Sequence, residues 1–324
     1  MLVSILIPCF NAEPWIGEAI ESALAQTWAD KEVIVVDDGS MDGSLGVIKR
    51  FDDRIRWESG PNRGGNAARN RLLELARGEW LQYLDADDYL RPEKVQRQAE
   101  YATAHPECEI VLSPVVSEIH EADGGITLTE WSFPEPRDPW RLLARWRMPQ
   151  TGGSLWKKTA IERVGGWRVD QPCCQEHELY LRLLNAGCRF GFCDSRLAVY
   201  REFGIPGRVT HKHRHRIVRE RLAIVGRAEQ SLRSRNELTT ERRQDVNDAR
   251  HELARLAWNA FGDRQLAMEA IGEIAASDPD FQPSPGDASP SLYRLAYRLG
   301  GFEFAQRIAA TKRGLTSSLR FGYG

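Results

Sequence analysis

The stretch WLQYLDADDYLRPEKV, residues 80–95, joins a strand pattern to a cluster of carboxylates. Apolar side chains alternate through WLQYL, and Asp85, Asp87 and Asp88 follow at once. Like charges this close repel one another unless a cation or a raised pKa relieves the repulsion. Pro92 then allows a new helix to begin. The acidic turn can therefore be a helix cap, or it can supply oxygen ligands to a hard divalent metal.

Strands and helices alternate ahead of this stretch. LVSILIP at 2–8 and EVIVVDD at 32–38 are short β-branched runs. An amphipathic helix is predicted between them, with Asn11 as a candidate cap. A second helix is predicted over 62–78, with Gly78 as its stop. Parallel neighbours need long crossovers, which are usually helices. The order therefore predicts an α/β fold with a mostly parallel sheet and helices on both faces.

Polar residues follow each predicted strand of this sheet. Open α/β sheets bind ligands at the carboxyl ends of their strands. Those ends carry Pro8 to Asn11, Asp37 with Asp38, and the acidic turn at 85–88. Asn66 and Arg69 stand close to these ends in a glycine-rich segment. A site with carboxylates, a metal and an arginine suits a nucleoside diphosphate, because the metal and the arginine can bind phosphates.

The pattern is more mixed from about residue 100 to 200. Strands are indicated at 107–120, followed by a hairpin turn at DGGI. Helices are indicated at 139–146 and 177–187, the second closed by Gly187. After residue 212 only helical periodicity remains, interrupted by a proline-rich break at 278–290. The chain is therefore expected to end in a helical region.

The composition indicates a packed soluble protein, since 42% of the residues are hydrophobic, 28% are charged and the net charge is -2. No apolar run approaches the roughly 20 residues that span a bilayer. The first residues lack the features of a signal peptide, so a cytoplasmic location is expected. Six scattered cysteines without a CxxC pair favour reduced thiols, and Cys173, Cys174 and His177 make only a weak case for zinc.

Four segments together resemble the successive motifs of the inverting family 2 glycosyltransferases, which have the GT-A fold. They are VSILIPCFNAEPWIGEAIESALAQTW, EVIVVDDGSMDGS, GPNRGGNAARNRLLELARGEWLQYLDADDYL and QEHELYLRLLNAG. The resemblance covers about residues 1–205. It implies a catalytic domain at 1–210, with a nucleotide-binding half at 1–100 and an acceptor half at 101–210. The helical appendage would then occupy 211–324.

The resemblance also implies an activity. A sugar would pass from a nucleotide-sugar, most often a UDP-sugar, to a hydroxyl of a glycan, a lipid-linked saccharide or a protein. The setting would be bacterial surface polysaccharide biosynthesis. Two rivals stay open: a catalytically silent GT-A-like binding module, and a sugar-phosphate nucleotidyltransferase. Processive synthesis is not expected, because no Q-x-x-R-W signature is present.

The family motifs assign roles to particular residues. The nucleotide-sugar site would comprise Pro8, Phe10, Asn11, Glu13, Asp37, Asp38, Asn66, Arg69, Asp85 and Ala86. Asp37 or Asp38 would hydrogen-bond the base or ribose, and Asp85 would face the ribose and donor sugar. Asp87 would hold Mn²⁺ or Mg²⁺, with Asp85 and His211 as further candidate ligands. Relatives place that histidine soon after a Tyr-Arg pair, whereas this chain has Phe203 there.

Inverting transfer requires a base that removes the acceptor proton. The family usually supplies an Asp in an E-D pair before an L-x-L-R-L helix. That helix corresponds here to 179–183, and Gln175-Glu176 stands in place of E-D. Glu176 is therefore the predicted base, with Glu178 as the alternative. Both could instead be acidic first-turn residues favoured by the helix dipole.

Acceptor and partner contacts are less sharply indicated. Trp156 and Trp167 lie in the region where GT-A enzymes vary most, and their rings could face an acceptor sugar or pack in the core. The basic C-terminal region, with Lys312, Arg313 and Arg320, could contact the inner face of the cell membrane. A homodimer is a further possibility, and no nucleic-acid partner is expected.

Overall fold

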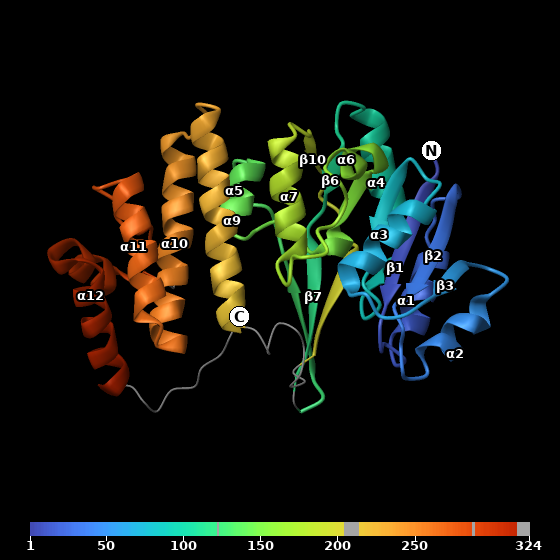
Figure 1. The fold of residues 1–324 in the computed structure, drawn as a ribbon, viewed down its shortest axis with the longest axis horizontal. Helices are drawn as coiled ribbons and strands as arrows, with labels where there is room; N and C mark the ends of the chain where they lie inside the picture. The colour runs from blue at the N-terminus through green and yellow to red at the C-terminus, as the bar shows by residue number, and fades with distance from the viewer. Residues whose placement is uncertain (122, 204–213, 287–288, 316–324) are drawn as a thin grey trace. The chain divides into compact units, whose positions relative to one another are not determined.

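The alternating strands and helices predicted from the sequence are present in the computed structural model of the chain (Figure 1). The described residues are 1–121, 123–203, 214–286 and 289–315. The chain forms two units, Met1–Leu143 with Arg147–Lys212, and Ala144–Trp146 with His213–Gly324.

A seven-stranded sheet runs through the first unit in the order β10-β6-β9-β4-β1-β2-β3. Its strands are β1 (Val3–Cys9), β2 (Lys31–Asp37), β3 (Arg56–Ser59), β4 (Trp80–Tyr83), β6 (Ile110–Leu112), β9 (Ser154–Lys157) and β10 (Phe190–Phe192). β1 pairs in parallel with β2 and β4, and β2 pairs in parallel with β3. Only β9 runs antiparallel to its neighbours β4 and β6. The predicted mostly parallel sheet is confirmed.

Helices cover both faces of this sheet. They are α1 (Ile16–Leu24), α2 (Ser44–Ile48), α3 (Gly65–Leu75), α4 (Lys94–Ala104), α6 (Lys158–Arg163) and α7 (Gln175–Asn185), and α5 (Pro139–Ala144) is a further short helix. Ile5 and Ile7 of β1 belong to the same buried cluster as Ile20 of α1. α3 also contacts β1 and β2. Because successive strand residues point to opposite faces, β1 can pack against α1 on one side and α3 on the other.

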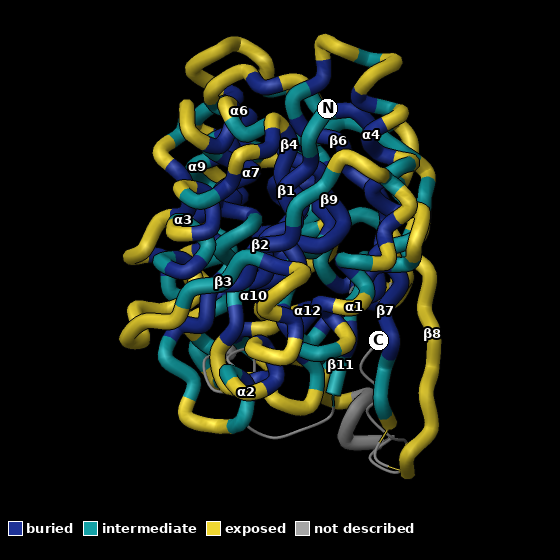
Figure 2. Tube along the Cα trace, turned by 90° about the vertical axis from the view of Figure 1, so that its right-hand side faces the viewer, coloured by how far each residue is buried: buried dark blue, intermediate teal, exposed yellow. Residues whose placement is uncertain are grey.

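A second sheet has the order β5-β11-β7-β8. It consists of β5 (Tyr89–Leu90), β7 (Val115–His120), β8 (Ile126–Glu130) and β11 (Ala198–Phe203). β8 is exposed along its whole length, whereas β1 is almost entirely buried (Figure 2). β5 begins directly after the acidic turn at 85–88 and pairs with β11. The second sheet therefore supports the turn that carries the carboxylates.

Three local predictions differ from the structure. Asn11 does not cap α1, which begins at Ile16 without a side-chain cap. α3 begins at Gly65 and ends at Leu75, so Gly78 does not terminate it. Gly78 is required for another reason, because a Cβ atom there would lie 2.6 Å from the backbone nitrogen of Ser4. The third difference is β9, an interior strand in a segment that we expected to contact the acceptor.

A buried ion-pair network joins the acidic turn to both β11 and α1. The Arg201 guanidinium lies 3.1 Å from Glu118 and 2.7 Å from Glu18, and its carbon stands 4.5 Å from the centre of the Tyr89 ring. The backbone nitrogen of Arg201 donates to Asp88 at 2.8 Å. Asp88 therefore accepts a hydrogen bond from the backbone of β11, and α4 has no side-chain cap.

Arg201→Met is expected to lower the free energy of unfolding by about 3 kcal/mol, because it leaves the buried Glu118 without its cation. Urea denaturation measures this loss. Arg97→Met is the matched control, since Arg97 and its partner Glu93 are each 55% exposed and such pairs contribute less than about 1 kcal/mol. Equal losses in the two variants would contradict a buried role for the network.

The second unit is helical over its described residues, as predicted. It contains α9 (Arg214–Ser234), α10 (Thr240–Phe261), α11 (Arg264–Ser277) and α12 (Ser291–Leu315). Thr239 and Asp263 cap α10 and α11 through their side chains. α12 bends at Gly301, whose φ is 72° (Figure 1). Within the described part of the chain, no helix combines the length and apolar character needed to cross a bilayer.

Candidate functional site

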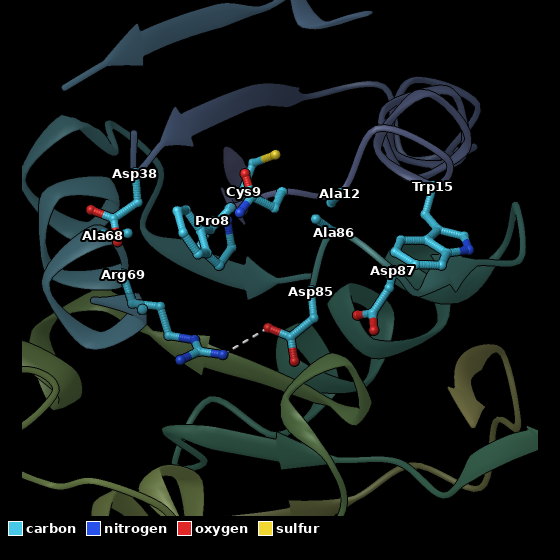
Figure 3. A pocket seen from close by; sticks show the side chains of 13 residues that line it. Pro8, Cys9, Ala12, Trp15, Asp38, Ala68, Arg69, Asp85, Ala86 and Asp87 are labelled. Atoms are coloured by element: carbon cyan, nitrogen blue, oxygen red, sulfur yellow. Dashed lines mark hydrogen bonds and ion pairs between the residues drawn. The ribbon is translucent and has the colours of Figure 1, made fainter. Parts of the chain in front are cut away.

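A cavity of about 340 Å³ opens at the carboxyl ends of β1 and β4 (Figure 3). It is lined by Pro8, Cys9, Phe10, Asn11, Ala12, Trp15, Asp38, Gly65, Ala68, Arg69, Asp85, Ala86 and Asp87. Figure 3 shows Arg69 reaching toward Asp85, and Trp15 beside Asp87. Most of the residues predicted for a nucleotide-sugar site therefore line one cavity. Asp37, Asn66 and Glu13 do not line it.

Arg69 is held in the cavity by polar and aromatic contacts. Its Nη2 lies 2.8 Å from Oδ1 of Asp85, and its Nη1 donates to Oδ1 of Asn66 at 3.3 Å. The side-chain nitrogen of Asn66 donates in turn to the backbone oxygen of Arg168 at 2.6 Å. Asn66 thus orients Arg69 from outside the cavity. Burial disfavours the charge of Arg69, but Asp85 and Glu176 outweigh burial, so the pKa of Arg69 is raised.

The two tryptophans expected at the acceptor site lie in the core. Trp156, on β9, is 0% exposed, and Trp167 is 2% exposed. Neither ring offers a face on which a sugar could stack, so their acceptor assignment is corrected. The Trp167 ring centre instead lies 5.0 Å from the guanidinium carbon of Arg69. Trp167 therefore supports Arg69 by a cation–π contact.

Asp37 and Asp38 are both buried at the end of β2. The two oxygens of Asp38 accept the backbone N–H groups of Arg63 and Gly64, each at 2.8 Å. Asp37 accepts the Ser59 hydroxyl at 2.7 Å and lines a neighbouring hollow. Only Asp38 of this pair lines the cavity beside Arg69.

The loop between β1 and α1 is fastened to the loop after β2. Oδ1 of Asn11 accepts the backbone N–H of Met41 at 2.8 Å. Oε2 of Glu13 accepts the backbone N–H of Gly43 at 2.9 Å. These bonds fix the loop that carries Phe10, whose ring is 46% exposed. Glu13 therefore shapes the cavity wall without lining the cavity itself.

Glu176 lies in the first turn of α7 and is partly buried. Its pKa is raised because burial disfavours the carboxylate, and the Asp85 charge adds to this effect, whereas Arg69 opposes it. Glu176 therefore interacts electrostatically with Arg69 and Asp85, although it is not among the residues that line the cavity. Glu178 is 1% exposed, and both of its oxygens accept the Nε–H of Arg182, at 3.0 and 2.9 Å. Glu178 is thus engaged in a buried ion pair.

The carboxylates of Asp85 and Asp87 supply the hard oxygen donors of the cavity. Mg²⁺ and similar cations are commonly held by one or two carboxylates together with substrate phosphates and water. These two carboxylates therefore fit such an ion when the oxygens of a diphosphate complete its coordination shell. The described residues contain no group of three or more His, Cys, Asp or Glu side chains that could hold a metal without substrate. His211 lies outside the described residues.

Sequence reasoning missed five lining residues, which are Cys9, Ala12, Trp15, Gly65 and Ala68. Trp15 faces the acidic turn from the start of α1, and its ring centre lies 5.0 Å from that of Phe203. Its position directly after Pro14, in the loop that follows the first strand, was the available signal. Cys9 ends β1, and burial raises the pKa of its thiol to about 11. Cys9 therefore stays protonated at neutral pH and is no nucleophile.

The comparisons with known proteins concern the family and the fold. Residues 4–161 match the model of the family "Glycosyl transferase family 2". The match spans 158 of the 324 residues, and over them the chain is similar to that family. An uncharacterized glycosyltransferase of Nostoc sp. is 31% identical over 179 residues, covering 51% of this chain and 53% of the relative. Hyaluronan synthase of Pasteurella multocida is 42% identical over 98 residues, covering 29% of this chain and 10% of that protein.

The chain matches only part of each relative's length, between 30% and 53% for the first three curated relatives. Solved structures match a larger share of this chain. S. aureus TarS 1–349 in complex with UDP-GlcNAc has a TM-score of 0.63 at 15% identity, covering 97% of this chain and 92% of TarS. The mannosyltransferase PcManGT from Pyrobaculum calidifontis, in complex with GDP-Man and Mn²⁺, has a TM-score of 0.55 at 20% identity, covering 98% and 88%. The expected GT-A fold is confirmed.

Proposed function

We propose that this chain is a metal-dependent inverting glycosyltransferase that transfers a sugar from a UDP-sugar to a hydroxyl group. One observation carries the proposal: Asp85, Asp87 and Arg69 line one cavity, and Glu176 is close enough to shift the pKa of Arg69. This arrangement combines groups for binding a diphosphate with a carboxylate that can accept a proton. A silent binding module would not need a base beside the phosphate-binding groups.

In this proposal the cavity binds the donor along its length. Phe10 offers a ring to the base, Asp38 approaches the base or ribose, and Asp85 faces the ribose and donor sugar. Arg69 is positively charged and shielded from water, so it can pair with phosphate oxygens. Asn66 and Trp167 hold Arg69 in place, and Glu13 holds the loop of Phe10. The hydrogen-bonded loops prepare the site before the donor arrives.

Asp87 and Asp85 would hold the Mn²⁺ or Mg²⁺ ion. When bound, the ion offsets the negative charge that develops on the leaving diphosphate. Support comes from the oxygen donors of the cavity and from PcManGT, which was solved with Mn²⁺.

We assign the site to a catalytic domain at residues 1–210, with nucleotide contacts from 1–100 and acceptor contacts from 101–210. We assign residues 211–324 to a C-terminal appendage, which is helical over its described residues.

Glu176 would take the proton from the acceptor hydroxyl as it attacks the anomeric carbon. The proton passes to the Glu176 carboxylate, the new C–O bond forms opposite the diphosphate, and the diphosphate leaves with the electrons of the broken bond. One displacement inverts the anomeric centre. Glu178 is a poorer base, because Arg182 stabilises its charged form and occupies its oxygens.

The pH dependence of turnover should report on this base. Glu176 must be ionised to accept a proton, and burial raises its pKa above the ordinary value of about 4.3. Activity is therefore expected to fall, as the pH is lowered, around a midpoint higher than that ordinary value. A kcat profile from acid to neutral pH measures the midpoint. A midpoint at or below the ordinary value would contradict the assignment.

The acceptor is proposed to be a glycan, a lipid-linked saccharide or a protein, within bacterial surface polysaccharide biosynthesis in the cytoplasm. The relatives named hyaluronan synthase and chondroitin synthase support a glycan product.

The direct test of the proposed function is a hydrolysis and transfer screen of nucleotide-sugars with Mn²⁺ or Mg²⁺. UDP release from one donor, abolished by a chelator, is the expected result. Binding of UDP without turnover of any donor would instead indicate a silent binding module.

A further inference from the structure

The first half of α12 exposes leucines and buries tyrosine. Leu292, Leu295 and Leu299 are 52%, 51% and 73% exposed, whereas Tyr293 is 3% exposed and Ala296 is 5% exposed. The spacing of the three leucines places them on one face of the helix. We call Leu292, Leu295 and Leu299 the leucine face. It forms a continuous apolar stripe, which differs from the single apolar residues scattered over ordinary surfaces.

The opposite face of α12 is fixed by its own contacts. The Tyr293 hydroxyl lies 3.1 Å from Nε2 of His251 and accepts a hydrogen bond from Gln306 at 3.2 Å. Tyr293, Ala296 and Ala305 form a buried cluster with Tyr297 packed against it. Turning the helix to bury its leucines would break these contacts. The leucine face is therefore directed outward by the packing of the unit.

The charge of this segment differs in sign from that of the rest of the chain. Residues 291–324 contain six of the 44 Lys and Arg residues and one of the 46 Asp and Glu residues. That segment thus carries +5, and residues 1–290 carry -7, with 38 basic against 45 acidic residues. Arg298 is exposed between Leu295 and Leu299 in sequence. An apolar stripe within a cationic segment matches the chemistry of helices that lie on anionic membranes.

We propose that the leucine face of α12 docks onto the surface of an anionic lipid bilayer. The leucines would enter the boundary between headgroups and acyl chains, and the exposed Arg298 on the same helix would pair with lipid phosphates. A symmetric contact between two copies of this face would bring two cationic segments together, which is unfavourable. The charge of the segment therefore favours lipid over self-association. This inference does not depend on the proposed reaction.

Sedimentation of the full chain with vesicles tests the proposal. Binding is expected to vesicles of equimolar phosphatidylcholine and phosphatidylglycerol, to weaken with added salt, and to be slight on phosphatidylcholine alone. The variant Leu292→Ser/Leu295→Ser/Leu299→Ser should lose affinity for the mixed vesicles about tenfold or more. The control Leu256→Ser/Met268→Ser changes exposed apolar residues of α10 and α11 and should bind as the parent does.

Two further measurements keep the outcome clear. Circular dichroism melting should show that the triple variant is folded, because its changes are on the surface. If the triple variant unfolds, the single variant Leu299→Ser, at the most exposed of the three positions, takes its place in the vesicle experiment. Light scattering on a sizing column reports the oligomeric state. A dimer dissociated by the leucine changes, without vesicle binding, would overturn the proposal in favour of self-association. Equal vesicle binding by parent and variant would overturn it as well.

Discussion

Asp87→Asn is expected to reduce donor turnover about 1,000-fold in the presence of Mn²⁺ or Mg²⁺. Asp87 lines the cavity on the same turn as Asp85, and an amide cannot replace a carboxylate as an anionic ligand. The side chain keeps its size, so the fold should be preserved. Initial rates of UDP release over a titration of metal measure the effect. The loss should shrink as metal is raised, because the variant binds the ion more weakly.

Asp53→Asn is the matched control for this experiment. Asp53 is exposed and does not line the cavity, and the substitution changes the net charge by the same amount. It should leave both turnover and metal dependence unchanged. If Asp87→Asn kept full activity at limiting metal, the metal-dependent mechanism would be wrong. Loss of activity in both variants would point to net charge as the cause.

Glu176→Gln is expected to lower kcat by about 100- to 10,000-fold while leaving donor binding nearly unchanged. Glutamine preserves the shape of the side chain but cannot accept a proton. Because a negative charge near Asp85 is removed, the affinity for UDP should stay the same or rise. Steady-state kinetics and UDP titration calorimetry separate the two effects. The acid limb of the pH profile should also disappear with this substitution.

Glu178→Gln provides the contrast, because Glu178 is buried with Arg182. Its loss leaves Arg182 without its charge partner and should reduce the unfolding free energy by about 3 kcal/mol. Turnover at a temperature where the variant is folded should be largely retained. The opposite result, with Glu178→Gln inactive but stable and Glu176→Gln active, would transfer the role of base to Glu178.

The sheet was predictable because its signals are local. β-branched runs, glycine turns and helical periodicity mark β1, β2, α3 and β4 within short windows. The candidate site was predictable to the same extent, since the carboxyl ends of parallel strands meet at one edge. Strand β9 was missed, because SLWK has no alternating pattern. Its strand conformation depends on antiparallel pairing with β4 and β6 on either side.

The roles of single side chains depended on long-range contacts. The sequence could not show that Trp156 and Trp167 are buried, since an aromatic ring suits a core and a sugar equally well. Nor could it distinguish Glu176 from Glu178, which stand two positions apart on one helix. Their difference comes from Arg182, which turns one of them into a structural ion pair.

The sequence by itself determined the order of strands and helices, the family motifs and the place where carboxylates gather. Backbone preference and hydrophobic period are properties of neighbouring residues, so they can be read along the chain. Only the tertiary structure decided that Asp38 lines the cavity while Asp37 does not, and that Asp88 accepts a hydrogen bond from the backbone of β11. It also decided that the leucines of α12 face outward. Burial and charge pairing arise between residues far apart in sequence, so they exist only once the chain has folded.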